Sequence, residues 1–314
     1  MKQNYLQKNM VVFLLAAICC VLWGSAFPCI KIGYSLFEIV GSDTATIIFF
    51  GGTRFFLAGL LGITIASVSA KKILIPDGAG LKKAALLSLF QTILQYLFFY
   101  IGLANTSGVK ASIVESVHVF VAIAVSAWIF RQEKLTSRKV LGCVLGIIGV
   151  VLVNLDPAAM NFELSLKGEG FILISTIAYA FSTVIMKEAS KTHSPVMLSG
   201  YQFTLGGLVM MVIGFVMGGR ITHITPVGIG MLLYLAFVSA AAYSLWGILL
   251  KHNDVSKVSV YGFLTPVFGM VLSVFLLNEG KTVSVKNLLA LVIVCVGIAI
   301  VNGAGPQRKE QSLQ

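Results

Sequence analysis

Residues 10–30 read MVVFLLAAICCVLWGSAFPCI, and this stretch decides the fold class of the chain. It runs for twenty-one positions without a charged side chain. An α-helix needs about 20 mostly apolar residues to cross the hydrocarbon core of a bilayer. The run is too long for the apolar core of a signal peptide, and no small-residue cleavage site follows it. We therefore interpret it as a retained membrane-spanning helix.

Nine further apolar runs of similar length follow it. The connections between them are short, for example 105–107, so no soluble domain fits between two runs. The sequence predicts an all-α, polytopic membrane protein of ten transmembrane helices. The expected spans are 10–35, 44–70, 82–104, 107–130, 137–155, 168–188, 195–218, 227–250, 256–277 and 284–303.

The composition supports a lipid-embedded protein. Of 314 residues, 57% are hydrophobic and only 11% are charged, and the mean hydropathy is +0.94. A soluble domain carries about 25% charged residues, so the bilayer is expected as the solvent of much of the surface. The net charge of +11 does not indicate nucleic acid, because the basic residues lie in short loops and no nucleic-acid-binding motif occurs.

The sequence also argues against several kinds of chemistry. All five cysteines lie inside apolar runs without CxxC spacing, which favours neither a metal site nor a disulfide framework. No GxxxxGK[ST] loop occurs, so direct use of ATP is not expected. GxSxG, HExxH and paired intramembrane aspartates are missing as well, so we expect no catalytic residues and no cofactor.

The distribution of Lys and Arg predicts the orientation, because cytoplasmic loops of membrane proteins are enriched in these residues. With the N-terminus in the cytoplasm, sixteen basic residues fall inside and five outside. Both termini are then expected in the cytoplasm of a cell (inner or plasma) membrane. The inside residues are Lys2, Lys8, Lys71, Lys72, Lys82, Lys83, Arg131, Lys134, Arg138, Lys139, Lys187, Lys191, Lys251, Lys257, Arg308 and Lys309, and the outside residues are Lys110, Lys167, Arg220, Lys281 and Lys286.

The second half of the chain repeats features of the first. Phe55 matches Phe203 and Gly149 matches Gly297, both at an offset of 148, and Tyr96 matches Tyr243 at 147. We expect a first repeat at 1–155, a second at 156–304 and a polar cytoplasmic tail at 305–314. Each repeat holds five spans, an odd number, so the two copies enter the membrane in opposite directions. Inverted repeats are typical of secondary transporters.

Several motifs resemble the EamA-type drug/metabolite transporter family over nearly the whole chain. The first half carries Trp23-Gly24-Ser25-Ala26-Phe27, Arg54-Phe55-Phe56-Leu57-Ala58-Gly59, and Glu133 followed by Gly142, Gly146 and Gly149; the second carries Pro266-Val267-Phe268, Glu279 and Gly297. The resemblance implies two inverted five-helix EamA-type repeats and a cavity lined mainly by spans one, three, four, six, eight and nine. One departure is His118-Val119-Phe120, where the family commonly has Pro in place of the histidine.

Repeat and resemblance together indicate a secondary transporter that moves a small metabolite, such as an amino acid, an amine or a similar amphiphilic solute. Export by alternating access is expected, with protons as a candidate coupling ion. The alternatives are a structural or sensory membrane protein and, less favoured, an intramembrane enzyme. The sequence indicates neither the substrate, the coupling ion nor the oligomeric state.

Two titratable residues are the foremost candidates for substrate binding. Glu115 lies well inside the fourth span, and His118 follows three positions later on the same helical face. A charge in the bilayer is expensive, so such a pair is expected to bind a cationic group or to exchange protons. The alternative for Glu115 is a structural ion pair with Arg54 or Lys31. Two ligands alone do not indicate a metal site.

Further candidates are polar or aromatic residues on spans that line the cavity in the family pattern. Interhelical hydrogen bonding explains Gln91 and Gln95 about as well as substrate contact does, and each aromatic residue taken alone is more typical of packing or of an interfacial belt. Arg54 is interpreted as structural, because Gln202 stands at the matching place, and so are Glu133 and Glu279 at helix ends. The candidates are Trp23, Gln91, Gln95, Tyr96, Tyr179, Tyr243, Trp246 and Tyr261.

Overall fold

The computed structural model describes residues 5–106, 111, 114–154, 165–277 and 285–303. Every regular element within these ranges is a helix, and each of the ten expected runs is helical over most of its described residues. The expected boundary between the repeats, Glu279 and the tail 305–314 lie outside the described residues.

The first half begins with a 3-10 turn, and its helices include two π-helical turns. The elements are η1 (Tyr5–Gln7), α1 (Asn9–Leu36), α2 (Thr44–Ser69), α3 (Gly78–Ser88), the π-helical η2 (Leu89–Leu94), α4 (Gln95–Ala104), α6 (His118–Ala124), the π-helical η3 (Val125–Ile129) and α7 (Ser137–Asn154).

The second half has a similar series. Its elements are the π-helical η4 (Leu166–Gly170), α8 (Phe171–Ser190), α9 (Pro195–Val216), α10 (Pro226–His252), α11 (Val255–Ser259), the 3-10 turn η5 (Val260–Phe263), α12 (Leu264–Leu277) and α13 (Val285–Asn302).

Seven continuous helices in the described part are long and apolar enough to cross a membrane. They are Asn9–Leu36, Thr44–Ser69, Gly78–Ala104, Leu166–Ser190, Pro195–Val216, Pro226–His252 and Val255–Ser273, and the shorter apolar helices Val114–Ile129 and Leu289–Asn302 accompany them. Large apolar side chains are exposed along these helices, as a bilayer allows. Examples are Phe13, Leu14, Leu60, Ile65, Val212 and Phe237.

Polar caps fix where several helices begin. Asp43 accepts a hydrogen bond from the Thr46 backbone N–H at 3.0 Å, Asp77 accepts one from Gly80 at 2.7 Å, and Thr225 accepts one from Gly228 at 3.0 Å. Such caps satisfy backbone donors that have no partner inside the helix. The bond from Gly80, aided by His193, lowers the pKa of Asp77.

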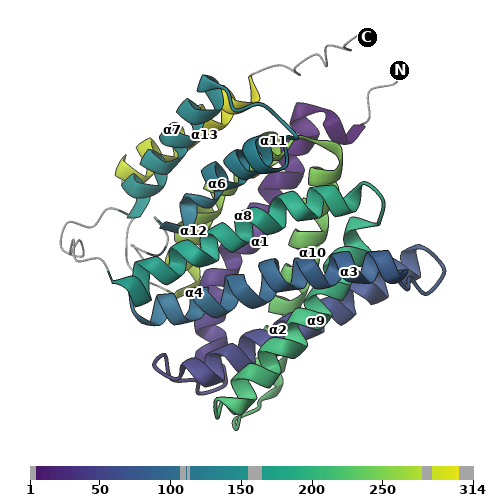
Figure 1. Ribbon diagram of the computed structural model, residues 1–314. Coiled ribbons are helices and arrows are strands. Elements are labelled where there is room, and N and C mark those ends of the chain that lie inside the picture. Colours follow the sequence, from purple (N-terminus) through teal and green to yellow (C-terminus); the bar gives the residue numbers. More distant parts are fainter. Residues whose placement is uncertain (1–4, 107–110, 112–113, 155–164, 278–284, 304–314) are drawn as a thin grey trace.

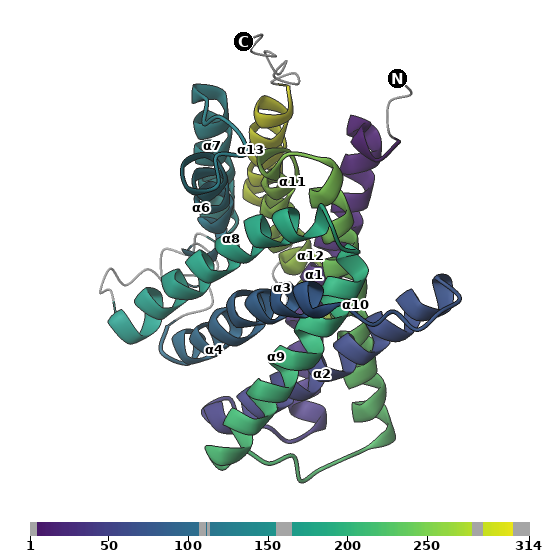
Figure 2. The same ribbon diagram turned by 45° about the vertical axis from the view of Figure 1, so that its right-hand side comes forward.

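Helices at matching places in the two halves pack against each other. The pairs are α2 with α9 and α7 with α13, and both pairs lie side by side in Figures 1 and 2. The contact of α1 with α10 is matched by that of α8 with α4, and the contact of α1 with α12 by that of α8 with α6. Each contact between helices of the two halves thus recurs between the matching helices when the halves are exchanged.

Glycines bring α2 and α9 close together. A Cβ at Gly52 would lie 2.9 Å from the Gly207 carbonyl oxygen, and a Cβ at Gly207 would lie 2.8 Å from that of Gly52. In the same way, a Cβ at Gly59 would lie 2.7 Å from the Gly200 carbonyl oxygen. Small residues permit such backbone contact between membrane helices.

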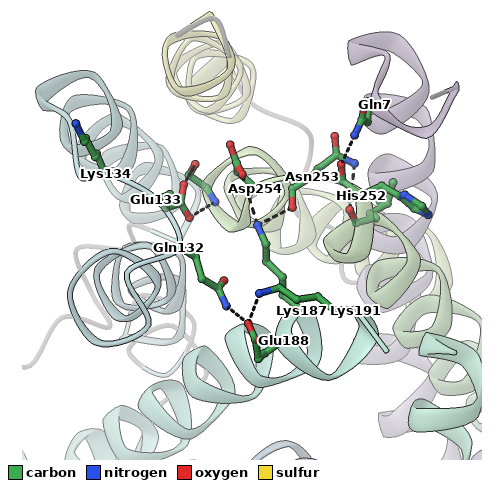
Figure 3. A network of polar contacts seen from close by, with 12 residues as sticks. Gln7, Gln132, Glu133, Lys134, Lys187, Glu188, Lys191, His252, Asn253 and Asp254 are labelled. Carbon is green, nitrogen blue, oxygen red and sulfur yellow. Dashed lines mark hydrogen bonds and ion pairs between the residues drawn. The ribbon is translucent and has the colours of Figure 1, made fainter. Parts of the chain in front are cut away.

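Most loops that were expected in the cytoplasm lie toward the end of the molecule where α1 begins and α13 ends, while the loop between α2 and α3 lies farther to the side (Figure 1). Figure 3 shows the contacts there. Lys187 Nζ donates to the Asn253 carbonyl at 3.0 Å and lies 3.5 Å from Asp254 Oδ1. The contacts between loops at this end are Gln132 with Glu188, Glu133 with Ser256, Lys83 with Thr192, His193 with Asp77, Asn253 with Leu6 and Lys257 with Gln7.

Candidate functional site

A cavity of about 130 Å³ lies between the two halves. The first half contributes side chains from α1, α2, α4 and residues 115–118, and the second contributes side chains from α8, α10, η5 and α12. These elements include all six spans that the family resemblance implied, together with α2. The lining residues are Trp23, Ala26, Phe27, Ile30, Arg54, Gln95, Tyr96, Phe99, Glu115, Ser116, His118, Tyr179, Val238, Ser239, Tyr243, Gly262, Thr265 and Pro266.

Aromatic rings form much of the cavity wall. Trp23 meets Tyr243 edge-on with ring centroids 5.1 Å apart, and Tyr179 lies 6.5 Å from Tyr243. The hydroxyl oxygens of Tyr96 and Tyr243 are 2.8 Å apart, so one donates a hydrogen bond to the other. Rings with polar tips combine an apolar surface with directed hydrogen bonds, which suits an amphiphilic solute.

Glu115 and His118 both reach this cavity. The helix is interrupted by a turn at Val117, and α6 begins at His118. His118 Nδ1 lies 2.9 Å from the backbone carbonyl oxygen of Glu115. Because a carbonyl only accepts, Nδ1 carries a proton, and Nε2 is the nitrogen that gains or loses one. The imidazole ring lies 4.9 Å from the ring of Tyr179.

Gly262 lies against the other nitrogen of His118. A Cβ at Gly262 would be 3.0 Å from His118 Nε2 and 3.2 Å from Cε1. The position where the family commonly has proline therefore holds an imidazole that packs on a residue of the opposite half. This contact lies at the cavity wall, because both residues line it.

Arg54 lines the same cavity although its side chain was interpreted as structural. It is buried, and within the described ranges its Nε and Nη1 have no hydrogen-bond partner. Its guanidinium carbon lies 4.4 Å from the ring centroid of Phe55 and 5.9 Å from that of Tyr96. Neither of these two nitrogens therefore takes part in the alternative ion pair of Arg54 with Glu115.

Three of the candidates lie outside the cavity lining. Gln91 is buried in the π-helical η2, which separates it from Gln95 on α4. Trp246 packs behind Trp23 with ring centroids 5.0 Å apart, and Tyr261 lies 6.0 Å from Phe13. The candidates that do line the cavity are Glu115, His118, Trp23, Gln95, Tyr96, Tyr179 and Tyr243.

Sequence reasoning missed Arg54, several small polar residues and two phenylalanines of the lining. Ser116, Ser239 and Thr265 carry no distinctive sequence pattern. Arg54 did carry a signal, since a charge well inside an apolar run is a functional candidate by default. Its match to the neutral Gln202 concealed that signal.

Comparison with known proteins identifies the family. The sequence model of the EamA-like transporter family matches residues 10–155 and again residues 166–303. The chain belongs to the EamA-like transporter family. This match extends over nearly all of both halves.

Curated relatives of this EamA-like transporter carry names of the same kind. The uncharacterized transporter YvbV of Bacillus subtilis is 26% identical over 96% of this chain and 94% of its own length. An uncharacterized transporter of Archaeoglobus fulgidus is 30% identical over 86% of this chain and 91% of its own. A WAT1-related chloroplastic protein of Arabidopsis thaliana is 28% identical over 89% of this chain and 66% of its own.

A solved crystal structure has the same fold. It matches with a TM-score of 0.76 over 93% of this chain and 96% of its own, at 16% sequence identity. Together with the apolar helices, the family match makes this EamA-like protein a multi-pass membrane transporter whose surroundings are the bilayer and whose substrate is a small molecule.

Proposed function

We propose that this protein is a secondary transporter that exports a small amphiphilic solute, such as an amino acid or an amine, by alternating access. The observation that carries the proposal is the cavity between the two halves, whose wall combines Glu115, His118 and aromatic rings. Substrate sites of secondary transporters lie near the bilayer midplane, between repeats of opposite orientation.

The ten-helix inverted repeat is part of this proposal. The family model matches once in each half. Phe55 and Phe203, which match in sequence, stack at 5.3 Å with their planes 2° apart. When a two-fold axis relates two repeats, a residue near the axis contacts the matching residue of the other repeat. A contact farther from the axis occurs twice, the second time between the two matching residues. The Phe55–Phe203 stack is a contact of the first kind, and the glycine contacts of α2 with α9 are of the second.

Alternating access also needs closure at the two ends in turn. Contacts join the two halves at the end shown in Figure 3, since Gln132 bonds Glu188 and Glu133 bonds Ser256. We infer that this is the cytoplasmic end, because the loops rich in Lys and Arg lie there. In the proposed cycle these contacts hold the cytoplasmic end closed, and export requires them to open and reform.

Glu115 and His118 supply a route to coupling. A carboxylate and an imidazole on one cavity wall can each change charge or compensate the charge of a bound solute. If a proton and a solute depend on the same two groups, binding of one changes the affinity for the other. Protons are therefore the proposed coupling ion, and Nε2 of His118 is the atom that exchanges them.

Transport by the purified protein in proteoliposomes tests the proposal. Glu115→Gln keeps size and hydrogen bonding but removes the charge, so solute flux and its pH dependence between about pH 6 and pH 8 should fall while the protein level holds. Glu38→Gln, which changes an exposed carboxylate outside both the cavity and the contacts in Figure 3, is the control. Normal flux and pH dependence in Glu115→Gln would contradict the proposed role, and no flux of any solute would favour a structural or sensory protein.

A further inference from the structure

Arg54 is a buried cation at the cavity wall, and some of its N–H donors have no acceptor among the described residues. Its residue is only 4% exposed, it lines the cavity, and its Nε and Nη1 donate to none of the described residues. A guanidinium keeps its charge at any accessible pH. A buried charge without hydrogen-bond acceptors is expensive, so this arrangement indicates a ligand that supplies them.

Aromatic rings surround the guanidinium but accept no hydrogen bond from it. Its central carbon lies over the ring of Phe55, and Phe55 is itself stacked on Phe203. The ring of Tyr96 is the second aromatic neighbour. Aromatic faces attract the cation through their quadrupole, but they offer no lone pair to its N–H groups. The side chain is therefore positioned in advance, with two donors that no described residue satisfies.

The matching residue of the second half is neutral, so the equivalent position on α9 is filled without a charge. Gln202 is completely buried, and its Oε1 accepts a hydrogen bond from Thr92 Oγ1 at 2.7 Å, while its Nε2 has no partner among the described residues. It does not line the cavity. A neutral amide bonded to its neighbour serves at that position, whereas the first half places a permanent cation against the cavity.

We propose that Arg54 is the anion-binding residue of the cavity and that the transported solute carries a carboxylate. This inference rests on the transport function proposed above and narrows its substrate class, because simple amines are excluded. Arg–carboxylate pairs are short, charge-assisted and often bidentate. The carboxylate binds at Arg54, the apolar part contacts the rings of Trp23 and Tyr243, and Glu115 accepts an amino group where the solute has one.

Matched ligands test the inference on the wild-type protein in detergent, by thermal shift and calorimetry. Each set contains an amino acid, its decarboxylated amine and its deaminated acid. The sets are phenylalanine, phenethylamine and 3-phenylpropanoate; tryptophan, tryptamine and 3-indolepropionate; and leucine, isoamylamine and 4-methylpentanoate. We expect at least one acid-bearing member to bind about tenfold or more tightly than its amine. Absence of any carboxylate-dependent binding across the three sets overturns the proposal.

Variants assign the carboxylate to Arg54. Arg54→Gln introduces the residue found at the matching place in the second half and should lower the affinity for acid-bearing ligands by about tenfold or more. The affinity of Arg54→Lys should lie between those of Arg54→Gln and wild type. Arg220→Gln, an arginine that donates to the Phe215 and Gly219 carbonyls, is the control and should bind normally. Equal binding of acids by wild type and Arg54→Gln overturns the assignment. If Arg54→Gln does not fold, Arg54→Lys decides by the same criterion.

Binding and flux together separate this inference from the transport function. Acids that bind through Arg54 but are not carried into proteoliposomes contradict transport and leave the anion site intact. Amines that bind and are carried while no acid does contradict the anion site and leave transport intact.

Discussion

The hydroxyl groups of Tyr96 and Tyr243 are joined by a hydrogen bond of 2.8 Å between residues 147 positions apart in the chain. Tyr96 is on α4 and Tyr243 on α10, and both line the cavity. The two residues match each other in the sequence repeat, so the bond joins equivalent places of the two halves. Any movement of one half against the other must stretch this bond or carry both rings along.

Removal of either hydroxyl should destabilise the protein, and removal of both should not add to the loss. Tyr96→Phe leaves the buried Tyr243 hydroxyl without this partner, which costs about 1 kcal/mol or more, whereas replacing both partners by apolar groups is nearly neutral. We expect Tyr96→Phe and Tyr243→Phe to lower the Tm by a few degrees each, and the double variant to be no worse than either. Thermal unfolding in detergent measures this coupling, and strictly additive losses would contradict it.

A methyl group at Gly207 should separate α9 from α2. The added Cβ would meet the backbone of Phe56 and the carbonyl oxygen of Gly52, and backbone atoms cannot move aside. Such overpacking costs about 1–3 kcal/mol. Gly207→Ala is therefore expected to lower the Tm by several degrees.

Gly230→Ala on α10 is the matched control for this change. Nothing lies within 4 Å of a Cβ at that position. Alanine is the better helix former by about 1 kcal/mol, so the control should be neutral or slightly stabilising. Equal behaviour of the two variants would mean that α2 and α9 are not in close contact.

The positions of the helices could be predicted from the sequence, but breaks within them could not. The run 44–70 became α2 (Thr44–Ser69), because apolar length and an Asp cap fix both ends of that helix. The π-helical η2 has no sequence signature, since its extra residue per turn changes no composition. Gln91 and Gln95 were therefore predicted on one stripe, although only Gln95 reaches the cavity.

Replacing Glu133 should lower the stability of the protein far more than replacing Glu188, an exposed glutamate at the same end of the molecule. Glu133 has a side chain only 4% exposed, pairs with Lys139 Nζ at 2.6 Å and accepts from the Ser256 backbone N–H at 3.1 Å. Glu133→Gln leaves the buried Lys139 ammonium uncompensated, and breaking one partner of a buried pair costs about 3–5 kcal/mol. A large fall in Tm is expected in detergent.

Glu188→Gln provides the comparison at the same end of the molecule. Its side chain is 48% exposed and pairs with Lys191 at 2.5 Å. Exposed pairs contribute about 1 kcal/mol or less, so this variant should unfold close to wild type. If Glu133→Gln were equally mild, the buried contact would not hold α11 against the first half.

Cysteine labelling should place the two ends of the molecule on opposite sides of the membrane. In a background without the exposed Cys295, Lys72→Cys and Lys191→Cys are expected to react with impermeant maleimide only from the cytoplasmic side. Gly41→Cys and His223→Cys, in loops at the other end, should react only from outside. Labelling of His223→Cys from the cytoplasm would overturn the orientation and the inverted repeat.

Arg54 shows why the site was harder to predict than the fold. Its neighbours Phe55 and Tyr96 are 1 and 42 positions away in sequence. The cavity that Arg54 lines is formed by residues of both halves. The sequence showed Glu115 and His118 as a pair because three positions on one helix bring them together. No such local spacing links Arg54 to either of them.

Crowding His118 from the opposite half should reduce transport without removing any titratable group. A Cβ at Gly262 would lie 3.0 Å from Nε2, closer than nine in ten real Cβ contacts, so the imidazole must shift by a few tenths of an ångström. Nδ1 is held by the Glu115 carbonyl, so the ring cannot move freely and the Nε2 side is displaced. Gly262→Ala should therefore lower flux several-fold and alter its pH dependence, while Tm stays within a few degrees of wild type. His118→Gln should lose the same pH dependence, and Gly230→Ala should transport normally. If Gly262→Ala carried solute with an unchanged pH profile, Nε2 of His118 would not be the proton-exchanging atom that we propose.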